Sequence, residues 1–468
     1  MIVAIQRTIG SLLCTIAVMA MAGSLQAQQI NHTLSDYVDA AQRHMPVILQ
    51  KQALVDAAKA GVTDTRHAYL PTAFLADELN IGTDNSIPGS YLSYGIIPST
   101  SSGLHPSNNY QSAVGNIAIF QSQFELFDFG LKEARTRNAL AYQDLSQADL
   151  DREKFLLEWE VGKLYFDILK NRFQLAIDKQ NVSRYEDVYK VIEAVTRSGI
   201  KAGADSSLAL AELSKSRISY NQTEGQINQL REELSYLTGI ATADVLVDTT
   251  EVKEYLVTPD LISRGEYRDS LNNPMIVFYE KQQVLNQRNE DVVRKAYLPK
   301  LYLNATGWAR GSSIDYNGDY QSLSMGLGYQ RFNYMIGATL VYDLFNIQHG
   351  KDKLAISRYQ TQASNYDMQQ QELELRKVFD QADPAMNTAA KNLVEIPVQI
   401  KASQDTYNQK IAQYKAGIIN LIDLTNASFV LYRAQSDYVQ TISDWLLASL
   451  DKAASTNQLD PFIQSIKK

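Results

Sequence analysis

Side chains that could carry out catalysis or hold a metal are few in this sequence and widely separated. The five histidines are His32, His44, His67, His105 and His349. No two of them have the spacing of paired metal ligands on a helix, and no phosphate-binding loop, nucleophile elbow or dinucleotide fingerprint occurs. The only cysteine is Cys14, so the rest of the chain has no thiol for a disulfide or a thiolate–metal site. We therefore predict that the protein is not an enzyme and binds no cofactor and no metal.

The polar residues that do recur in a pattern are a glycine followed by an aspartate. In one place Ser198, Gly199 and Ile200 precede Asp205, and in the other Ala416, Gly417 and Ile418 precede Asp423 at the same spacing. Glycine permits the positive φ at which a helix ends and the chain turns back. An aspartate a few residues later suits the first turn of the returning helix. The pattern predicts two equivalent turns between helices.

These turns belong to a unit that is written twice. The segment 68–71, Ala-Tyr-Leu-Pro, recurs at 296–299, and Met45-Pro46 matches Asn273-Pro274 upstream of it. We divide the chain into a first repeat at 28–240, a polar linker at 241–260, a second repeat at 261–455 and a C-terminal tail at 456–468. The first repeat carries about 13 extra residues, because its marks are offset from those of the second repeat by 228 residues upstream and 215 downstream; they lie in the segment 86–109, which is rich in Ser, Pro, Gly and Asn and is predicted to be a loop.

Each repeat predicts the same order of elements. A helix ends at the Tyr-Leu-Pro mark, two strands follow, and a very long helix, a glycine turn and a returning helix complete the unit. Alternating, β-branched and aromatic residues place the strands at 72–81, 114–128, 300–309 and 334–345. The long helices are predicted at 131–196 and 350–414, and Pro384 and Pro397 should bend or locally break the second one.

A heptad stripe supports the first long helix and predicts coiled-coil packing. One seam position is filled by Val161, Ile168, Leu175, Val182 and Tyr189, and the other by Leu157, Leu164, Tyr185 and Ile192. Asn171 and Asp178 interrupt the second seam, which predicts imperfect packing or one wet edge there.

The first 27 residues are predicted to be a secretory signal peptide. Arg7 is their only charged residue, an apolar run follows, and 25–27 reads Leu-Gln-Ala before Gln28. Cys14 lies within the apolar run after Leu13, which argues against a lipid anchor. The net charge of −8 is the opposite of what a nucleic-acid-binding protein requires.

No later stretch is apolar for long enough to cross a bilayer as a helix, so membrane insertion would require a closed β-barrel. Four strands are too few to close a barrel, and a ring of several chains would remove every open sheet edge. Helices of the predicted length must pack as an extended bundle rather than a globular core.

The signal peptide, the doubled unit, and the Tyr-Leu-Pro and Gly-to-Asp marks resemble the TolC family of outer-membrane efflux proteins over essentially the whole exported chain. The resemblance implies an α+β membrane protein: a homotrimer whose 12-stranded outer-membrane β-barrel, with four strands per chain, continues as an antiparallel coiled-coil α-helical barrel in the periplasm. It also implies outer-membrane lipid, a periplasmic adaptor (membrane fusion protein) and an inner-membrane pump or type I secretion transporter as partners.

The same resemblance assigns roles at the two turns. Ser198, Gly199, Ile200, Ala416, Gly417 and Ile418 would dock the adaptor, although the glycines also read as helix caps. Tyr414 falls at the family's gating tyrosine and Asp205 at the aspartate that pairs with it. Asp423 matches the first of two aspartates in the aperture, Asn426 stands in place of the second, and Ile419 replaces a gate arginine. Three copies of Asp423 would favour cations, while a solvated helix-start aspartate and ordinary surface positions for Tyr414 and Asp205 are the competing interpretations.

Two functional alternatives remain open at this point. A periplasmic coiled-coil adaptor or scaffold would also have a signal peptide and a helical hairpin, but it would not carry strand pairs inside a duplicated unit. A duct for secreted peptides or proteins, rather than for small molecules, would have the same sequence features, because cargo is chosen upstream of a passive conduit.

Overall fold

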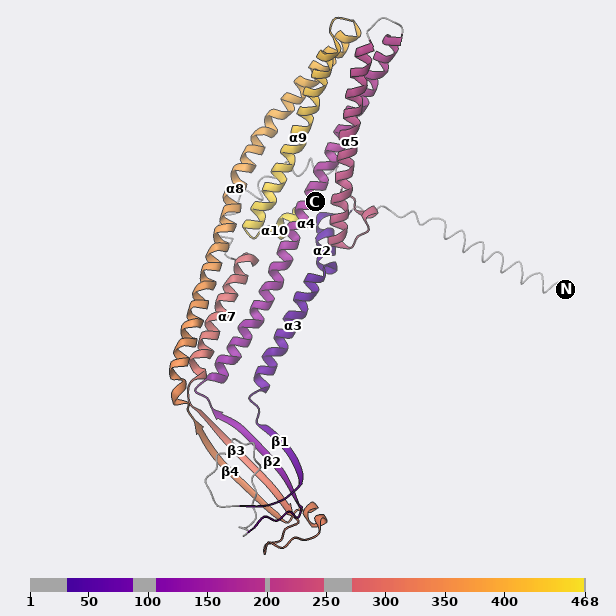
Figure 1. Cartoon of the computed structure of the whole chain (residues 1–468). Coiled ribbons are helices and arrows are strands. Elements are labelled where there is room, and N and C mark those ends of the chain that lie inside the picture. The colour runs from indigo at the N-terminus through magenta and orange to yellow at the C-terminus, as the bar shows by residue number, and fades with distance from the viewer. Residues whose placement is uncertain (1–31, 87–106, 198–202, 248–271, 467–468) are drawn as a thin grey trace, which may run out of the picture. The chain divides into compact units, whose positions relative to one another are not determined.

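The computed structural model describes residues 32–86, 107–197, 203–247 and 272–466 (Figure 1). The predicted signal peptide, most of the predicted loop at 86–109, most of the linker, and Ser198, Gly199 and Ile200 lie outside these residues.

The chain packs as two units, each of which takes segments from both sequence repeats. The helical unit comprises Met1–Ala53, Gln147–Tyr279 and Asp367–Lys468, and the strand unit comprises Leu54–Ser146 and Glu280–Tyr366. The internal duplication therefore does not correspond to two folded domains, because segments from both repeats share each core.

The prolines shared by the two repeats each begin a helix. α2 (Leu34–His44) opens with a capping box between Thr33 and Asp36, and α3 (Pro46–His67) follows it directly. In the second repeat α7 (Pro274–Ala296) also starts at its proline. Proline suits the first helical position because its missing N–H would have no partner there.

The long helix of the first repeat, α4 (Leu131–Arg197), is confirmed as one uninterrupted element. Its heptad stripe faces the interior: Val161 is fully buried and Ile168 and Ile192 are each 1% exposed. It is followed by α5 (Gly203–Thr238) and a short 3-10 turn, η1 (Thr242–Asp244).

The long helix of the second repeat, α8 (Ile347–Lys415), runs through both of its prolines without interruption. Of the two predicted effects, a bend or a local break, the break is wrong. Pro384 and Pro397 lie on the exposed side of the helix. Each proline removes one backbone hydrogen bond, and on the exposed side water can solvate the carbonyl that loses its partner.

α9 (Leu421–Ser455) returns along the helical unit and carries its most continuous buried surface. The segment 456–468, which we predicted to be a tail, contains a further helix, α10 (Leu459–Ser465), whose Leu459, Phe462 and Ile463 are buried. Phe462 lies 6.2 Å from the ring of Phe166 on α4, so α10 is packed into the helical unit.

Four antiparallel strands form one sheet in the order β1-β2-β3-β4. They are β1 (Thr72–Gly82), β2 (Ala113–Phe127), β3 (Lys300–Ser312) and β4 (Arg331–Val341). The prediction for the last strand was wrong at both ends. It begins earlier, at Arg331, and it stops before η5 (Leu344–Asn346), whose N-cap Asp343 accepts a hydrogen bond from the Phe345 backbone N–H at 3.2 Å.

Another short 3-10 helix, η4 (Leu323–Leu327), lies in the connection between β3 and β4. Among the helices that the structure describes, none combines the length and the apolar composition needed to span a bilayer.

Candidate functional site

The turn between α8 and α9 is closed by a Schellman motif, a hydrogen-bonding arrangement that ends a helix. Gly417 has φ +74°, and its N–H donates to the Tyr414 carbonyl at 3.0 Å. The next N–H, of Ile418, donates to the Gln413 carbonyl at 2.9 Å. Together these bonds satisfy carbonyls that the helix end would otherwise leave unpaired. The cap interpretation of this glycine is therefore correct, and the exposed Ala416, Gly417 and Ile418 still offer a surface to a partner.

α9 starts with an asparagine cap. The side-chain oxygen of Asn420 accepts a hydrogen bond from the Asp423 backbone N–H at 2.9 Å. The Asp423 side chain is exposed in the first turn of α9, where a negative charge is favoured by the helix dipole. Asn426 is also exposed, close to one helical turn further along. The helix-start interpretation of Asp423 accounts for its position, and the exposure leaves it available to line an aperture.

Tyr414 is not a surface residue, because its side chain is only 7% exposed. It belongs to a group of apolar side chains from the ends of α4, α5, α8 and α9, which we call the tip cluster. The buried members of the tip cluster are Val188, Ile192, Ala209, Tyr407, Tyr414, Leu421, Leu424 and Leu431. The two helix pairs are thus held together close to their turns within a single chain.

Asp205 lies in the first turn of α5 and is half-buried. Ala209, one helical turn later, belongs to the same tip cluster as Tyr414. The structure therefore brings the start of α5 and the end of α8 together, as the proposed pairing of Asp205 and Tyr414 requires. Ile419, at the position of the family's gate arginine, packs against the tip cluster and serves as an apolar contact here.

Asp178 of α4 is a buried carboxylate that the sequence analysis interpreted wrongly. Asp178 interrupts the heptad seam, but it is only 2% exposed and is fully hydrogen-bonded. It accepts hydrogen bonds from Gln174 at 2.9 Å, from the Tyr432 hydroxyl of α9 at 2.9 Å and from the Thr223 hydroxyl of α5 at 2.6 Å. The expected wet or imperfect edge at Asp178 is wrong, because these donors come from three helices of the same chain and replace water.

A half-buried arginine, Arg184, lies on α4 between Asp178 and the tip cluster. Arg184 donates to Gln435 of α9 and to Asn181, both at 3.2 Å, while its Nε has no partner among the described residues. Burial lowers the pKa of Arg184. Burial likewise raises the pKa of the neighbouring Tyr185 and Tyr407. Tyr185 was predicted as a residue of the heptad seam, whereas Arg184 and Tyr407 were not predicted from the sequence.

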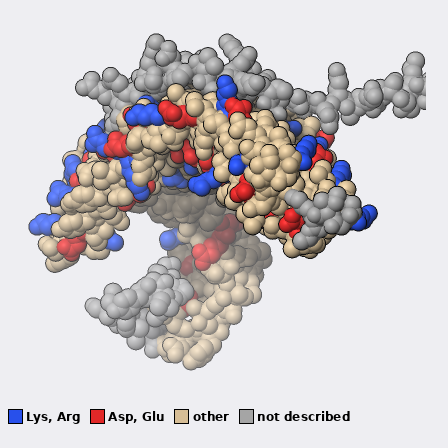
Figure 2. All heavy atoms as spheres, turned by 90° about the horizontal axis from the view of Figure 1, so that it is seen from above, with Lys and Arg blue, Asp and Glu red and all other residues tan. Residues whose placement is uncertain are grey.

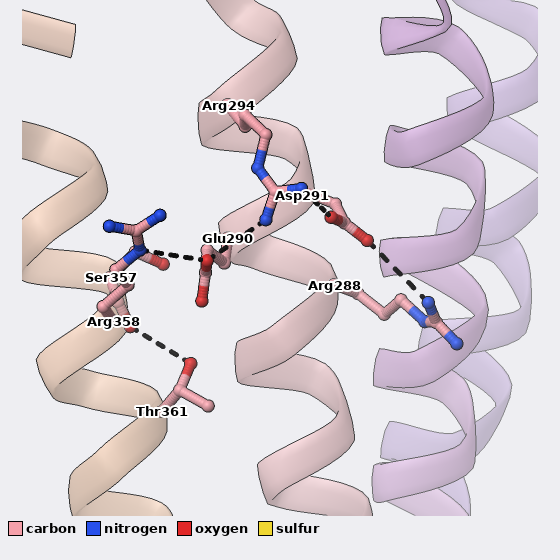
Figure 3. Close-up of polar contacts among 7 residues, drawn as sticks. All are labelled: Arg288, Glu290, Asp291, Arg294, Ser357, Arg358 and Thr361. Atoms are coloured by element: carbon pink, nitrogen blue, oxygen red, sulfur yellow. Dashed lines mark hydrogen bonds and ion pairs between the residues drawn. The ribbon is translucent and has the colours of Figure 1, made fainter. Parts of the chain in front are cut away.

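The strand unit has a charged network between α7 and α8 (Figure 3). Glu290 accepts from Arg294 at 3.2 Å and from Arg358 at 3.4 Å, and Asp291 lies 3.6 Å from Arg294 and 3.8 Å from Arg288. These side chains are mostly exposed, so each pair contributes little to stability. The network helps to hold two helices of one repeat side by side. Elsewhere on the face seen in Figure 2, basic and acidic side chains are interspersed rather than gathered into one patch.

The sheet has two chemically different faces. Directly opposed residues of antiparallel strands point to the same side, so the register assigns each residue to a face. One side, the apolar face, includes Leu75, Leu79, Ile81, Phe120, Phe124, Leu301, Leu303, Phe332, Tyr334, Ile336 and Leu340. The other side, the polar face, includes Thr72, Glu78, Asn80, Gln121, Gln123, Glu125, Lys300, Asn304, Thr306, Arg310, Arg331, Asn333 and Thr339. The alternation predicted for the strands is confirmed by this register.

Side-chain hydrogen bonds run across the polar face from strand to strand. Gln123 of β2 donates to Asn304 of β3 at 3.0 Å, and Asn304 donates to Thr339 of β4 at 3.0 Å. The apolar face instead presents large exposed side chains: Leu75 is 79% exposed, Tyr334 is 84% exposed and Ile336 is 71% exposed. Such a sheet suits a boundary between lipid on one side and water on the other.

Comparison with known proteins agrees with this geometry. The outer membrane efflux protein family matches residues 37–240 and 270–454. The fold is similar to that of the CmeC outer membrane channel of Campylobacter jejuni, with 13% identity over 95% of this chain and 91% of that chain and a TM-score of 0.72. It is also similar to the outer membrane protein VceC of Vibrio cholerae, with 11% identity over 90% of this chain and 95% of that chain and a TM-score of 0.73.

A third similar structure is the open state of the MtrE outer membrane channel of Neisseria gonorrhoeae, with 17% identity over 91% of this chain and 89% of that chain and a TM-score of 0.67. No curated protein sequence matches the chain. The alternative of a periplasmic adaptor or scaffold finds no support in these comparisons. The chain belongs to the outer membrane efflux protein family and is a TolC-like efflux channel of the outer membrane.

Proposed function

We propose that three copies of the chain close their sheets into one 12-stranded barrel and act as the passive exit duct of a tripartite efflux pump or type I secretion system. The observation that carries this proposal is the two-faced sheet. Its apolar face suits lipid contact, and its polar face, with the Gln123–Asn304–Thr339 ladder, suits a water-filled interior.

The sheet edges support a ring of chains. β1 and β4 lie at the two ends of the strand order, so among the described residues each has one side without a strand partner. An open edge in a bilayer leaves backbone N–H and C=O groups unsatisfied, at a cost of several kcal/mol each. With an even number of alternating strands, β4 of one copy can pair antiparallel with β1 of the next copy.

The two helix turns supply a gate and a docking surface in this proposal. Tyr414 and Asp205 hold the periplasmic end closed, and exposed Asp423 and Asn426 line the aperture. Ala416, Gly417 and Ile418, together with Ser198, Gly199 and Ile200, contact the periplasmic adaptor. Adaptor contact at this tip opens the duct, and the inner-membrane transporter supplies the energy, so the chain itself needs no catalytic residue.

Cysteine cross-linking tests the closure of the ring. Cys14 is the only natural cysteine, so introduced thiols report without background once the predicted signal peptide is removed. A cysteine at Ala76 of β1, combined in turn with one at Asn333, Met335 or Gly337 of β4, should yield dimers and trimers on non-reducing gels. In the control the cysteine is introduced at Ile119 instead of at Ala76. Ile119 is the Cα partner of Ala76 on β2, which is not an edge strand of the sheet.

Cross-linking from Ile119 but not from Ala76, or cross-links only within one chain, would count against the ring.

Single-channel conductance in planar bilayers then tests the duct itself. Small currents that increase when Tyr414 or Asp205 is replaced support a gate at this place, whereas unchanged conductance in both variants contradicts it.

A further inference from the structure

Two arginines lie directly opposite each other where β3 and β4 meet the connection that carries η4. Arg310 and Arg331 are Cα partners in the register, and the backbone N–H of Gln330 donates to the Arg310 carbonyl at 2.7 Å. Like charges directly across two strands repel each other and destabilise the sheet. An arrangement of this kind is favourable only where an anion or a polar medium compensates the charge.

Both arginines belong to the polar face of the sheet. On β3 the polar face includes Trp308 and Thr306, and on β4 it includes Asn333, the Cα partner of Trp308. The intervening residue on each strand, Ala309 on β3 and Phe332 on β4, lies on the apolar face, and these two residues are Cα partners. If the proposed function is right, the two guanidinium groups therefore point into the pore, at the end of the strands away from the helices.

Neither guanidinium forms an ion pair with any carboxylate that the structure describes. Arg331 donates only to the carbonyl of its neighbour Gln330, at 3.3 Å, and both side chains are exposed. On the same face and level, β1 contributes Glu78, which lies two strands from Arg310 and accepts a hydrogen bond from Asn80 at 2.5 Å.

Other carboxylates at this end of the strands are differently placed or already engaged. Asp77 of β1 lies on the apolar face. Asp315 accepts from the backbone N–H groups of Asn317 and Asp319 and from Gln321 within its own turn. The connection from β1 to β2, residues 83–112, contains a single carboxylate, the half-buried Asp84, and no Glu, Lys or Arg. The polar face therefore carries two arginines for each glutamate at this level.

We propose that Arg310 and Arg331 form an anion-attracting ring at the outer mouth of the duct, with carboxylates or phosphates of solutes as its ligands. Three chains bring six guanidinium groups to one level of the pore, and planar guanidinium forks are well suited to carboxylate and phosphate groups. Rings of Arg or Lys serve this purpose in anion-selective pores. The ring belongs to the strand unit and is separate from the acidic aperture proposed at Asp423, which belongs to the helical unit.

Trp308 provides a direct readout, because its side chain shares the polar face with both arginines. The chain has three tryptophans, and the other two are Trp159, which donates to Asp451 at 2.9 Å, and Trp445, which is 5% exposed. Quenching of tryptophan fluorescence by iodide and by caesium ions should be measured on purified trimers in lipid nanodiscs. The variant Trp308→Phe identifies the Trp308 component.

In the wild type at low ionic strength we expect iodide to quench Trp308 several-fold more strongly than caesium does, after correction for free tryptophan. A local potential of several kT concentrates counter-ions by that order. The double variant R310Q/R331Q should remove the preference, and high salt should do the same in the wild type. Lys300→Gln is the matched control, because Lys300 is a cation on the same face of β3 at its opposite end.

The outcomes separate this inference from the function on which it rests. If Trp308 is inaccessible to both ions, the polar face is not water-filled and the pore assignment fails. If both ions reach Trp308 with no preference, or if K300Q abolishes the preference as fully as R310Q/R331Q does, the pore assignment stands and the arginine ring is refuted. Loss of iodide preference in R310Q/R331Q alone supports the ring.

Discussion

The helical unit and the strand unit differ in how their unexpected charged side chains are compensated. In the helical unit, Asp178 is buried and receives hydrogen bonds from three helices of its own chain. In the strand unit, Arg310 and Arg331 face each other without a carboxylate partner among the described residues, and large apolar side chains such as Ile336 are exposed. Asp178 is satisfied within its own chain, whereas under the proposed function the strand unit is completed by lipid, water and further copies of the chain.

The difference indicates what each part needs in order to fold. A buried carboxylate with three donors has its desolvation cost offset locally. An open sheet with an exposed apolar face gains its stability only when both edges are paired and the apolar face is removed from water. We expect helical packing to survive in a single chain and the sheet to depend on assembly in the membrane.

The largest effect should come from placing a charge on the apolar face. Ile336→Arg puts a guanidinium at the middle of β4, where an arginine facing lipid costs about 2–4 kcal/mol per chain, so the proposed trimer as a whole would lose roughly 6–12 kcal/mol. Heat-resistant trimers in the outer-membrane fraction should largely disappear on gels run without boiling. Met335→Arg is the matched control, because Met335 is the preceding residue and points to the polar face. Equal loss of trimers in both variants would contradict the assignment of the two faces.

The next effect tests whether the tip cluster holds the ends of the helices together within one chain. Tyr414→Ala removes a buried ring from the tip cluster and should cost about 3–5 kcal/mol of local stability, as for other aromatic truncations. Hydrogen exchange in the last turns of α8 and the first turns of α9 should become much faster. Tyr414→Phe keeps the packing and removes only the hydroxyl.

The pair of Tyr414 variants also separates packing from gating. If Tyr414→Phe raises ion leakage as much as Tyr414→Ala does, the hydroxyl is part of the latch. If only Tyr414→Ala leaks, the tyrosine holds the tip closed by its ring, and the proposed pairing with Asp205 loses its support.

The Asp178 network should respond by a smaller amount. Asp178→Ala leaves the hydroxyls of the half-buried Tyr432 and Thr223 without their acceptor, which costs about 1–3 kcal/mol. Asp178→Asn retains one acceptor oxygen and the side-chain volume, so its loss should be smaller. Urea unfolding followed by circular dichroism of the helices measures both. Identical destabilisation by Ala and Asn would indicate that the negative charge, rather than the hydrogen bonds, matters at this position.

A pH effect is expected at the contact between α4 and α10. Burial, with a further contribution from neighbouring Asp460, raises the pKa of Glu158 to about 8, and Gln42 donates to this carboxyl at 2.6 Å. The folded state therefore binds the proton more tightly than the unfolded state does. The stabilisation is fully present below the pKa of an ordinary glutamate and is lost as pH rises through about 8.

Between pH 7 and pH 9 the loss should be roughly 1 kcal/mol. Protease accessibility or hydrogen exchange of the α10 segment should increase over that interval. Glu158→Gln remains uncharged at every pH and should remove the pH dependence of this segment. A pH response that persists in Glu158→Gln would assign the effect to other groups.

Sequence patterns anticipated most elements because each rests on a local signal. The heptad stripe predicted α4, and the alternation of apolar and polar residues predicted the strands. The start of β4 was missed because Arg331 becomes recognisable as a strand residue only when it is paired with Arg310. Its end was overestimated because Asp343 caps a 3-10 turn in a segment that is still aromatic and apolar.

The candidate functional residues divide in the same way. Tyr414, Asp205 and Asp423 were predicted from the repeated Gly-to-Asp turn and the family resemblance. The bonding of Asp178 to α5 and α9, and the pairing of the two arginines, depend on which distant segments come together. Only the interruption of the heptad seam hinted at Asp178, and it was interpreted as a packing defect because the distant donors could not be placed from the sequence.

The smallest effect is expected at Gly417, and it distinguishes a structural cap from a docking surface. Its φ of +74° is unfavourable for residues with a Cβ, but a Cβ there would meet no atom within 4 Å. Gly417→Ala should therefore cost only about 1 kcal/mol, from backbone strain alone. Asn tolerates this backbone conformation better than other residues do, so Gly417→Asn controls for strain while adding a larger side chain. If Gly417→Asn leaves trimers and thermal stability intact but lowers export, the turn is a surface that a partner contacts. If both variants export normally, the glycine serves only to end α8.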